Sequence, residues 1–527
     1  MRPLSETTSI CPECGKLLPA SIYEEDGKVW LSKECAEHGK TVELYFGDYG
    51  MYEKFKRFAH EGRGVENPAI TKKNPVCPLD CGLCTIHSSH TALANVVVTN
   101  RCDLNCYYCF FYCKEGDKVY EPSLEQLKKM FRSLRNEKPV GCNALQLTGG
   151  EPTLRDDLIE IIKLARQEGF EHVQLNTNGI RLSRSLEFAK ALRSAGIGTL
   201  YMSFDGVSAR TNPKNHWEVP AVLDNCRKAD IGVVLVPTVI RGVNDHELGD
   251  IIRFGFKNID VVRAVNFQPV SLVGRMPRQQ REKMRITIPD AIKKIEEQTD
   301  GQVGREDFYP IPCVSSITRL VEAFTGKPQY DLSAHFACGA ATYLFREGDE
   351  MIPITRFVDV EGLFAYLDDL SERVRNGKNK TLAKVELVAK LCGYINSKKK
   401  PRWLKLSTLL LNALVKHDYN ALGEFHKKAL FVGLMHFMDL YNYDVERVKR
   451  CTIHYAVPDG RIIPFCAFNV IPEKYRDEIQ AKYAVSQKEW SERTGKRIAD
   501  DFYKRDAALI KNCRCESCRR ERNQDVR

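Results

Sequence analysis

The segment LANVVVTNRCDLNCYYC, residues 93–109, joins an apolar run directly to three cysteines. Residues 93–99 are rich in valine, which is typical of a β-strand. Cys102, Cys106 and Cys109 follow at once, so they are expected at the carboxyl end of that strand. In barrels of parallel strands this end carries the functional residues. The rest of the fold therefore decides which side chains meet these cysteines.

Five further β-rich runs follow the first one, and an amphipathic stretch lies in each interval. The runs cover residues 144–148, 172–176, 199–204, 231–238 and 262–269, and the helical periods fall near residues 123–135, 156–168, 183–195, 217–229 and 245–257. Regular alternation of strand and helix predicts βαβ units, a parallel sheet and right-handed crossovers. We therefore predict an α/β fold with a partial (β/α)6 TIM-like barrel over residues 91–270.

The CxxxCxxC spacing of the three cysteines is typical of an iron–sulfur cluster site. Three thiolates would bind three irons of one 4Fe–4S cube and leave the fourth iron open to a chelator from outside the protein. A disulfide is the alternative. However, the chain has 20 cysteines among 527 residues and no secretory signal, which indicates an intracellular protein with reduced thiols. We therefore expect a 4Fe–4S cluster at Cys102, Cys106 and Cys109.

Three more groups of candidate residues follow the second, third and fourth predicted strands, at the same end of the sheet. Each would be an ordinary turn if it stood alone, but together they indicate a binding site around the cysteine loop. Paired glycines allow a backbone to approach a ligand closely, and the glutamate beside them could accept a hydrogen bond from an ammonium group. The residues are Gly149, Gly150 and Glu151 after the second strand, Asn178 after the third, and Ser203 and Asp205 after the fourth.

The cysteine loop and the glycine–glycine–glutamate motif resemble the radical S-adenosylmethionine (SAM) superfamily, over about residues 90–270. The resemblance implies that SAM chelates the open iron and that the reduced cluster cleaves it to a 5′-deoxyadenosyl radical, with no further catalytic side chain. It also implies that the motif meets the methionyl ammonium group. The other implied cofactor contacts are Tyr108 near the adenine, Asn178, and Ser203 and Asp205 on the ribose side.

A second CxxxCxxC segment, formed by Cys77, Cys81 and Cys84, lies just upstream of the first. It lacks a preceding strand and a following glycine motif at the right distance. We therefore assign it to an auxiliary 4Fe–4S cluster, whose fourth ligand would be His87 or a distant cysteine. Unrelated free thiols are the alternative.

Two short metal-binding knuckles lie near the N-terminus. Cys11 and Cys14 form the first, and Cys35 and His38 form the second, about 20 residues further on. This pattern suits tetrahedral zinc or a mononuclear iron. A rubredoxin-like iron would require a fourth cysteine, which His38 puts in doubt. We favour a structural role over a redox role.

Eleven cysteines lie outside these three groups. Cys313, Cys338, Cys451 and Cys466 are candidates for a further auxiliary cluster or for completing the one at Cys77, although each alone is more often a small buried apolar residue. Near the C-terminus, Cys513, Cys515 and Cys518 have the spacing CxCxxC, which also suits a metal. We interpret the remaining four cysteines as packing residues; they are Cys113, Cys142, Cys226 and Cys392.

Composition and motifs together divide the chain into four parts. They are a metal-binding module (residues 1–70), an auxiliary cluster segment (71–90), the barrel (91–270) and a mainly helical region with auxiliary cluster ligands (271–527). No apolar stretch approaches about 18 residues, which argues against a transmembrane helix. We expect a cytoplasmic protein, with the inner face of the membrane as a candidate partner.

The C-terminal region combines basic charge with apolar helical periods. Residues 371–527 carry 33 lysines and arginines against 19 acidic residues, and residues 402–441 show wide apolar faces. We interpret the latter as helices that roof a hydrophobic channel, with ordinary helix packing as the alternative. Basic charge at the channel mouth would suit phosphate head groups.

The order of these modules resembles the archaeal tetraether lipid synthase family, most closely over residues 75–110 and 438–469. That resemblance implies that two isoprenoid, archaeol-type phospholipid chains are coupled by a C–C bond between terminal methyl carbons. It further implies two auxiliary 4Fe–4S clusters, a mononuclear iron or zinc, and an external electron donor such as ferredoxin. Nucleic acid is not expected as a partner.

Three other functions remain open. A radical SAM methylase of a pterin or other small heterocycle would use the same core and clusters, and a polar rather than lipid-sized cavity would favour it. A tRNA-modifying radical SAM enzyme would use the basic region, and steep salt-dependent RNA binding would favour it. A non-catalytic iron–sulfur scaffold would not cleave SAM.

Overall fold

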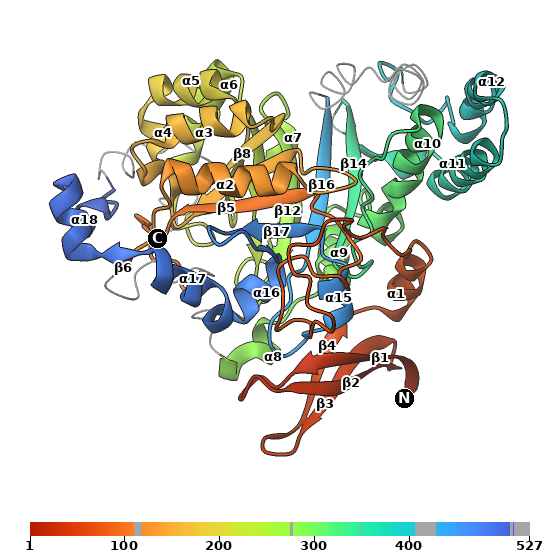
Figure 1. Ribbon diagram of the computed structural model, residues 1–527. Coiled ribbons are helices and arrows are strands. Elements are labelled where there is room, and N and C mark those ends of the chain that lie inside the picture. Colours follow the sequence, from red (N-terminus) through yellow and green to blue (C-terminus); the bar gives the residue numbers. More distant parts are fainter. Residues whose placement is uncertain (110–117, 274–277, 349, 406–427, 506–509, 511–527) are drawn as a thin grey trace, which may run out of the picture.

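The computed structural model describes residues 1–109, 118–273, 278–348, 350–405, 428–505 and 510. Its centre is a long sheet with helices packed along it, and a small separate sheet lies at one end (Figure 1). The central sheet combines strands from the predicted barrel with strands from residues 309–464. Segments far apart in the sequence therefore meet at the site described below.

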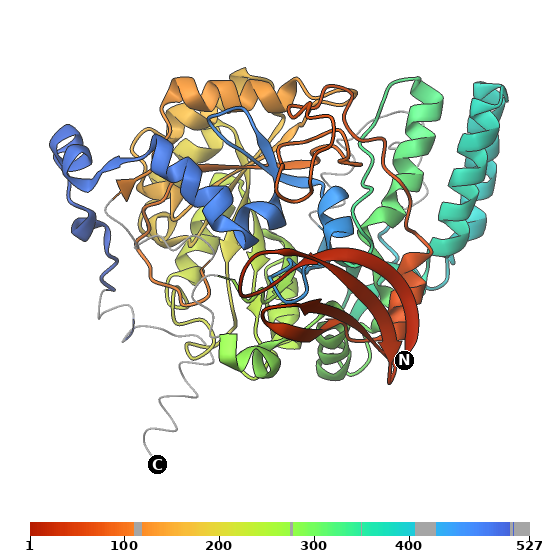
Figure 2. The same ribbon diagram turned by 60° about the horizontal axis from the view of Figure 1, so that its bottom comes forward.

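The small N-terminal sheet is a four-stranded antiparallel meander, which lies in front of the rest of the molecule in Figure 2. Two of its turns carry the predicted metal knuckles, where Gly15 and Gly39 take φ values of 70° and 73°. Glycine has no Cβ to clash in this conformation, so each knuckle can turn tightly. The strands are β1 (Arg2–Ile10), β2 (Leu17–Glu25), β3 (Lys28–Cys35) and β4 (Gly39–Phe46), and α1 (Tyr49–Lys56) follows them.

Polar contacts hold this small sheet against the C-terminal region. The Thr7 and Tyr45 hydroxyls donate to the two carboxylate oxygens of Asp444, at 2.6 and 2.7 Å. Lys33, which is 3% exposed, donates to the Leu440 carbonyl at 2.6 Å. Because these groups are largely buried, separating the two parts would leave polar atoms without partners.

The six strands predicted for the barrel are confirmed, and each pairs in parallel with the next along the chain. They are β5 (Leu93–Thr99), β7 (Ala144–Gly149), β8 (His172–Thr177), β9 (Ile197–Ser203), β10 (Gly232–Val236) and β12 (Val262–Pro269). The connections hold α2 (Leu124–Arg135), α3 (Leu158–Gln167), α4 (Ile180–Arg184), α5 (Leu186–Ala195), α6 (Val219–Ala229) and α7 (Leu248–Lys257), with the short strands β6 (Lys118–Val119) and β11 (Thr238–Val239). The predicted α/β class and TIM-like partial barrel are therefore right.

Helix α2 shows why these segments fold as their periodicity predicts. The Ser123 hydroxyl accepts the Gln126 N–H at 3.2 Å, and the Gln126 side chain accepts the Ser123 N–H at 2.8 Å. This capping box fixes where the helix begins. Leu127, Phe131 and Leu134 share one face and are buried in the main core. Burying a side chain of this size contributes about 1.5–3 kcal/mol.

Two strands from the C-terminal region extend the parallel sheet at its edges. β16 (Ala429–Met435) pairs with β12, and β17 (Ile453–Ala456) pairs with β5. The prediction of helices over residues 402–441 is therefore wrong for residues 429–435, and residues 406–427 lie outside the description. Most of β16 is buried, so its apolar residues do not alternate with polar ones. A short apolar run of this kind does not distinguish strand from helix.

The rest of the C-terminal region contains both helices and strands. Antiparallel β14 borders β16, and β18 borders β17. Among the described helices, none is long and apolar enough to cross a membrane. The helices are α8 (Arg281–Met284), α9 (Ile288–Gln298), α10 (Ser315–Thr325), α11 (Val360–Arg375), α12 (Lys380–Leu391), α15 (Val445–Lys449), α16 (Phe465–Val470), α17 (Arg476–Tyr483) and α18 (Gln487–Thr494), and the strands are β13 (Tyr309–Pro310), β14 (Gly339–Glu347), β15 (Glu350–Pro353), β18 (Ile462–Pro464) and β19 (Val485–Ser486).

Candidate functional site

The three cysteines of the predicted cluster loop line one cavity at the carboxyl ends of the barrel strands. Cys102, Cys106 and Cys109 share this cavity, the first cavity, with the Gly149–Glu151 motif and Ser203. The loop follows β5, the motif spans the end of β7, and Ser203 ends β9. Parallel pairing brings these segments to the same end of the sheet. The order of strands and motifs thus correctly predicted that these residues meet.

Gly149 and Gly150 lie against the backbone of the cysteine loop. A Cβ atom on Gly149 would stand 2.1 Å from the Thr99 carbonyl oxygen, and one on Gly150 would stand 2.1 Å from that of Arg101. The Gly150 N–H donates to Thr99 at 2.9 Å, and the Glu151 N–H donates to Arg101 at 2.7 Å. Only glycine leaves room for this approach, so the motif supports the loop that carries the cysteines.

Glu151 is buried and receives hydrogen bonds from the protein itself. Its carboxylate accepts the Thr177 hydroxyl at 2.7 Å, the Asn178 N–H at 2.8 Å, and the Thr153 N–H and hydroxyl at 3.1 and 2.6 Å. Burial and then the nearby Asp103 carboxylate raise the pKa of Glu151 to about 7. Asn178 in turn donates to Asp103 at 2.6 Å. Glu151 thus joins the ends of β7 and β8, and its contact with a methionyl ammonium stays a prediction.

A buried lysine that sequence reasoning missed lies between two of the predicted residues. The Lys214 ammonium is 2.6 Å from the Asp205 carboxylate and 2.7 Å from the Tyr108 hydroxyl, which itself donates to Asp205. The other Asp205 oxygen accepts the Thr238 N–H at 3.0 Å. Burial raises the pKa of the Cys106 thiol to about 11, and the Lys214 charge opposes that shift. No motif marks a single lysine in a loop, so only the fold reveals it.

Tyr108 and Lys214 also line a second cavity beside the first. Asp205 lies on its wall, and Cys106 belongs to the linings of both cavities. The two residues expected on the ribose side are therefore divided, since Ser203 lines the first cavity and Asp205 the second, while Tyr108, expected near the adenine, lines both. Their contacts with SAM stay predictions.

Side-chain amides form part of the first cavity wall inside the barrel. Gln146 donates to Asn95 at 3.0 Å and accepts from Gln174 at 3.0 Å, which ties β5, β7 and β8 together. Asn266 and Gln268 on β12 line the same cavity. Within the described part of the chain, neither of these two amides has a side-chain hydrogen bond, so both can bind a ligand.

Aromatic rings from the C-terminal region complete the lining of the first cavity. Phe437 and Phe465 stack with their ring centroids 4.0 Å apart, and Tyr455 stacks on Phe465 at 5.3 Å. These rings follow β16 or lie on and after β17. Sequence reasoning missed them because it ended the barrel at residue 270.

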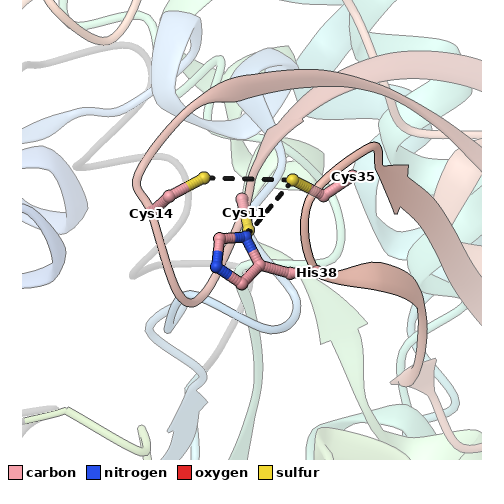
Figure 3. A group of neighbouring side chains, drawn as sticks. All are labelled: Cys11, Cys14, Cys35 and His38. Atoms are coloured by element: carbon pink, nitrogen blue, oxygen red, sulfur yellow. Dashed lines mark hydrogen bonds between the residues drawn. The ribbon is translucent and has the colours of Figure 1, made fainter.

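Cys11, Cys14, Cys35 and His38 converge at the two knuckles (Figure 3), and their ligand atoms all lie within 4.8 Å of one another. The Cys14 and Cys35 sulfurs are 3.9 Å apart, and His38 Nδ1 is 3.5 Å from Cys35 Sγ. The hydrogen bond with His38 lowers the pKa of Cys35 to about 6, which favours the thiolate that a metal binds. Three sulfurs and one imidazole fit tetrahedral zinc.

The second CxxxCxxC segment also brings thiols together. Hydrogen bonding with Cys77 and burial raise the pKa of Cys81 well above its usual range, and burial raises that of Cys84. A cationic iron centre would relieve the cost of ionising such a group, so the residues fit a cluster. His87 contacts the Cys451 carbonyl at 2.9 Å, and that contact occupies its Nε2.

Three of the four distant candidate cysteines gather near one arginine. The Arg447 guanidinium donates to the Cys338 sulfur at 3.3 Å, and Cys338 and Cys451 both act electrostatically on Cys466. Burial raises the pKa of Cys451 to about 12. Cys313 is buried elsewhere, and burial alone raises its pKa to about 12. The structure thus groups Cys338, Cys451 and Cys466 and leaves Cys313 apart.

The cysteines interpreted as packing residues give a divided result. Cys142 and Cys226 are fully buried, as expected. Cys392 is exposed, because α12 ends one residue before it, and the interpretation is wrong there. The remaining cysteines, Cys113, Cys513, Cys515 and Cys518, lie outside the described residues.

A partial parallel barrel with a CxxxCxxC loop after its first strand and a glycine–glycine–glutamate motif after its second defines a radical SAM protein, a class that uses a 4Fe–4S cluster and SAM. The chain matches the Radical SAM superfamily over residues 96–255 and the HMPTM N-terminal zinc ribbon domain over residues 3–47. The predicted superfamily and the N-terminal metal module are confirmed.

The chain is 47% identical over 495 residues to the 7,8-dihydro-6-hydroxymethylpterin dimethyltransferase of Methanocaldococcus jannaschii. The aligned region covers 92% of this chain and 96% of that protein. The chain therefore belongs to the family of that enzyme. It is also 32% identical over 186 residues to the GTP 3′,8-cyclase of Aquifex aeolicus, over 34% of this chain and 57% of the cyclase. Among solved structures, the FeFe-hydrogenase maturase HydG of Carboxydothermus hydrogenoformans matches with 18% identity and a TM-score of 0.30, over 40% of this chain and 52% of that one.

These findings contradict the predicted lipid-coupling function. The full-length relative is named for a pterin and for methyl transfer, so a tetraether lipid synthase, an archaeol-type phospholipid partner and C–C coupling of lipid chains are not retained. The prediction failed because the order of cysteine motifs identifies metal centres and leaves the substrate open. The apolar helices on which it relied include a strand at residues 429–435.

Proposed function

We propose that the protein is a radical SAM methyltransferase that acts on a pterin or a closely related bicyclic heterocycle. Its 47% identity to the pterin dimethyltransferase, over 92% of the chain, carries this proposal. The methylase alternative that the sequence left open is thereby favoured over lipid coupling.

The lining of the first cavity supports a flat substrate with hydrogen-bonding edges. Asn266 and Gln268 present amides that can both donate and accept hydrogen bonds. Phe437 and Phe465 present stacked rings, on which a planar heterocycle can pack. A pterin offers both a flat face and ring-nitrogen, amino and carbonyl groups at its edge, so it suits this combination.

The residues at the mouth of the barrel would hold the SAM-dependent machinery. Cys102, Cys106 and Cys109 provide three thiol ligands around one cavity, as a site-differentiated 4Fe–4S cluster requires. When bound, the cluster and SAM supply a radical that removes a hydrogen atom from carbon. Gly149 and Gly150 keep the cysteine loop against β7, which fixes where that chemistry occurs.

The other thiol groups are assigned to further metal centres. Cys77, Cys81 and Cys84 would hold one auxiliary 4Fe–4S cluster, and Cys338, Cys451 and Cys466 a second one. The N-terminal Cys3His group would hold zinc in a structural role. Iron, sulfide and zinc analysis of the anaerobically purified protein tests these assignments.

Incubation of the reconstituted, reduced protein with SAM and 7,8-dihydro-6-hydroxymethylpterin tests the proposed reaction. We expect 5′-deoxyadenosine and a pterin product that is heavier by one or two methyl groups, measured by mass spectrometry. GTP, the substrate named for the cyclase relatives, serves as a control and should give no methylated product. Active SAM cleavage without any methylated pterin would contradict the proposal.

A pair of variants separates the substrate site from the cofactor site. Asn266→Leu removes an amide from the cavity wall and should raise KM for the pterin by about tenfold, because a good hydrogen bond to a ligand is worth about 1–1.5 kcal/mol. SAM cleavage without substrate should persist. Gln167→Leu on the exposed face of α3 is the matched control and should change neither the KM for the pterin nor the cleavage of SAM.

A further inference from the structure

Residues 485–505, which we name the C-terminal strap, lie beyond the part of the chain that matches the radical SAM superfamily. The strap begins with β19, which pairs antiparallel with β6, and continues through α18 to residue 505. Figure 1 shows α18 beside β6, at one side of the barrel. The Lys118 carbonyl on β6 accepts the Asn100 side-chain amide at 3.1 Å, so the strap starts beside the residues that lead into the cysteine loop.

One anchor of the strap lies immediately before the first cluster cysteine. The Asp501 carboxylate accepts two hydrogen bonds from the Arg101 guanidinium, at 2.8 and 2.9 Å. Arg101 is 4% exposed and also donates to Glu121 at 2.8 Å. The Trp490 ring lies 4.6 Å from the guanidinium and donates to Glu121 at 2.9 Å. Both hydrogen bonds to Asp501 come from one guanidinium nitrogen, Nη1, and the ion pair is largely buried, so it is a strong charge-assisted contact.

A backbone hydrogen bond lies on the other side of the same cysteine. The Tyr503 N–H donates to the Asp103 carbonyl at 3.1 Å. Residues 101 and 103 are thus both bonded to the strap, and Cys102 lies between them. A displacement of the strap would therefore remove contacts on both sides of the first cluster ligand and loosen the segment that carries it.

A second anchor holds the segment that carries the buried lysine. Arg505 donates to the carbonyl oxygens of Pro213 and Lys214 at 3.1 and 2.9 Å, and to the Glu218 carboxylate at 2.8 Å. Lys214 is the residue whose ammonium contacts Tyr108 and Asp205. The strap therefore holds two segments that meet the candidate SAM site from different strands.

We propose that the C-terminal strap is a clamp that positions the cluster loop and the Lys214 segment for SAM binding. Arg101 and Asp501 are positioning residues in this role, because they act through Cys102 and its neighbours. Strap closure and SAM binding must then stabilise each other by the same factor, since coupling between two equilibria is reciprocal. The proposal rests on the radical SAM class and does not depend on the identity of the methylated substrate.

Limited trypsin digestion of the anaerobically reconstituted full-length protein tests this coupling. Cleavage after Lys488 and Arg493 in α18 requires local opening of the strap, and mass spectrometry identifies the sites. SAM should slow this cleavage. Asp501→Ala should speed it by about tenfold and weaken SAM binding by a similar factor, because it removes the strap's carboxylate from the buried Arg101 guanidinium and leaves that charge only partly compensated by Glu121. SAM affinity is read from the SAM-induced change in the EPR spectrum of the reduced cluster.

Two further variants control for folding and for surface charge. Asp501→Asn keeps the side-chain shape and, like Asp501→Ala, should speed trypsin cleavage and weaken SAM binding. Asp500→Ala removes a neighbouring carboxylate that pairs only with exposed Arg497 among the described residues. It should leave the cleavage rate and the SAM affinity unchanged. Unchanged iron and zinc contents would show that each variant is folded. Faster cleavage without weaker SAM binding, or cleavage that SAM does not slow, would overturn the proposal.

Discussion

The carbonyl oxygen of Arg101 lies 2.1 Å from the point where a Cβ atom on Gly150 would stand. The Arg101 carbonyl also accepts the Glu151 N–H at 2.7 Å, so a close approach and a hydrogen bond both join the glycine motif to the cysteine loop. The motif therefore works through its backbone as well as through any contact with SAM. Its glycines are a steric requirement of the loop above them.

Gly150→Ala should misplace the cysteine loop. The added methyl group would overlap the Arg101 carbonyl, so the loop must move by a distance of the order of an ångström. A shift of that size lowers the rate of a positioned reaction by about a hundredfold. We expect this loss in 5′-deoxyadenosine formation, measured with SAM and a chemical reductant. Gly198→Ala on β9 has nothing within 4 Å of its Cβ, and normal activity is expected there. Equal activity of the two variants would refute the steric account.

The barrel could be predicted from the sequence because its strands are local features. The predicted run at residues 93–99 coincides with β5, and the cysteines directly after it reach the cavity without any long-range information. β16 could not be predicted in the same way. Its seven residues are apolar throughout, and only pairing with β12 decides that they form a strand.

The missed residues of the site share a different cause. Lys214, Asn266 and Phe437 carry no motif, and each gains its role from elements that are distant in the sequence. The same holds for the grouping of Cys338 with Cys451 and Cys466, since spacing along the chain does not show which cysteines meet. Motif spacing therefore predicted candidate metal ligands, while the substrate side of the cavity required the tertiary structure.

Loss of one ligand should empty the N-terminal metal site. Cys35→Ser removes a sulfur that lies 3.5 Å from His38 Nδ1 and 3.9 Å from Cys14 Sγ. We expect the zinc content to fall by about one equivalent per chain, because structural zinc requires four ligands. Elemental analysis and thermal unfolding would report both the loss and the destabilisation. Glu37→Gln, which breaks only an exposed ion pair with Lys16, is the control and should retain the metal.

The contribution of Glu137 to the stability of the fold should fall as pH rises toward 8. Burial raises the pKa of Glu137 to about 7, and its hydrogen bond from Thr91 only partly offsets this. The folded state therefore binds the proton more tightly than the unfolded chain. This contribution is complete below about pH 4.5 and is lost as pH rises through about 7, with a total of about 3 kcal/mol.

Glu137→Gln isolates that contribution, because the amide keeps the acceptor for Thr91 but does not titrate. The difference in unfolding free energy between the two proteins should change by about 3 kcal/mol between pH 4.5 and 8, as measured by denaturant titration. Other buried groups, such as Glu151, titrate in both proteins and cancel. A difference that is independent of pH would show that Glu137 does not carry the effect.

Tyr443 and Tyr45 should respond in opposite ways to loss of the hydroxyl. Both rings are buried, but the Tyr45 hydroxyl donates to Asp444 at 2.7 Å, whereas that of Tyr443 has no partner among the described residues. The Cys81 thiol acts electrostatically on the Tyr443 hydroxyl, and the wider thiol group includes Cys77 and Cys466. The hydroxyl therefore lies near both candidate auxiliary sites.

In the metal-free protein, Tyr443→Phe should raise the unfolding free energy by about 1 kcal/mol, because it removes a buried group that lacks a hydrogen bond. Tyr45→Phe should lower it by about 1–3 kcal/mol, since Asp444 loses a donor. After anaerobic reconstitution, the gain from Tyr443→Phe should vanish or reverse, because cluster sulfur can accept the hydroxyl hydrogen. Thermal unfolding of both variants with and without iron measures this. A gain of the same size in both states would show that no cluster sulfur contacts Tyr443.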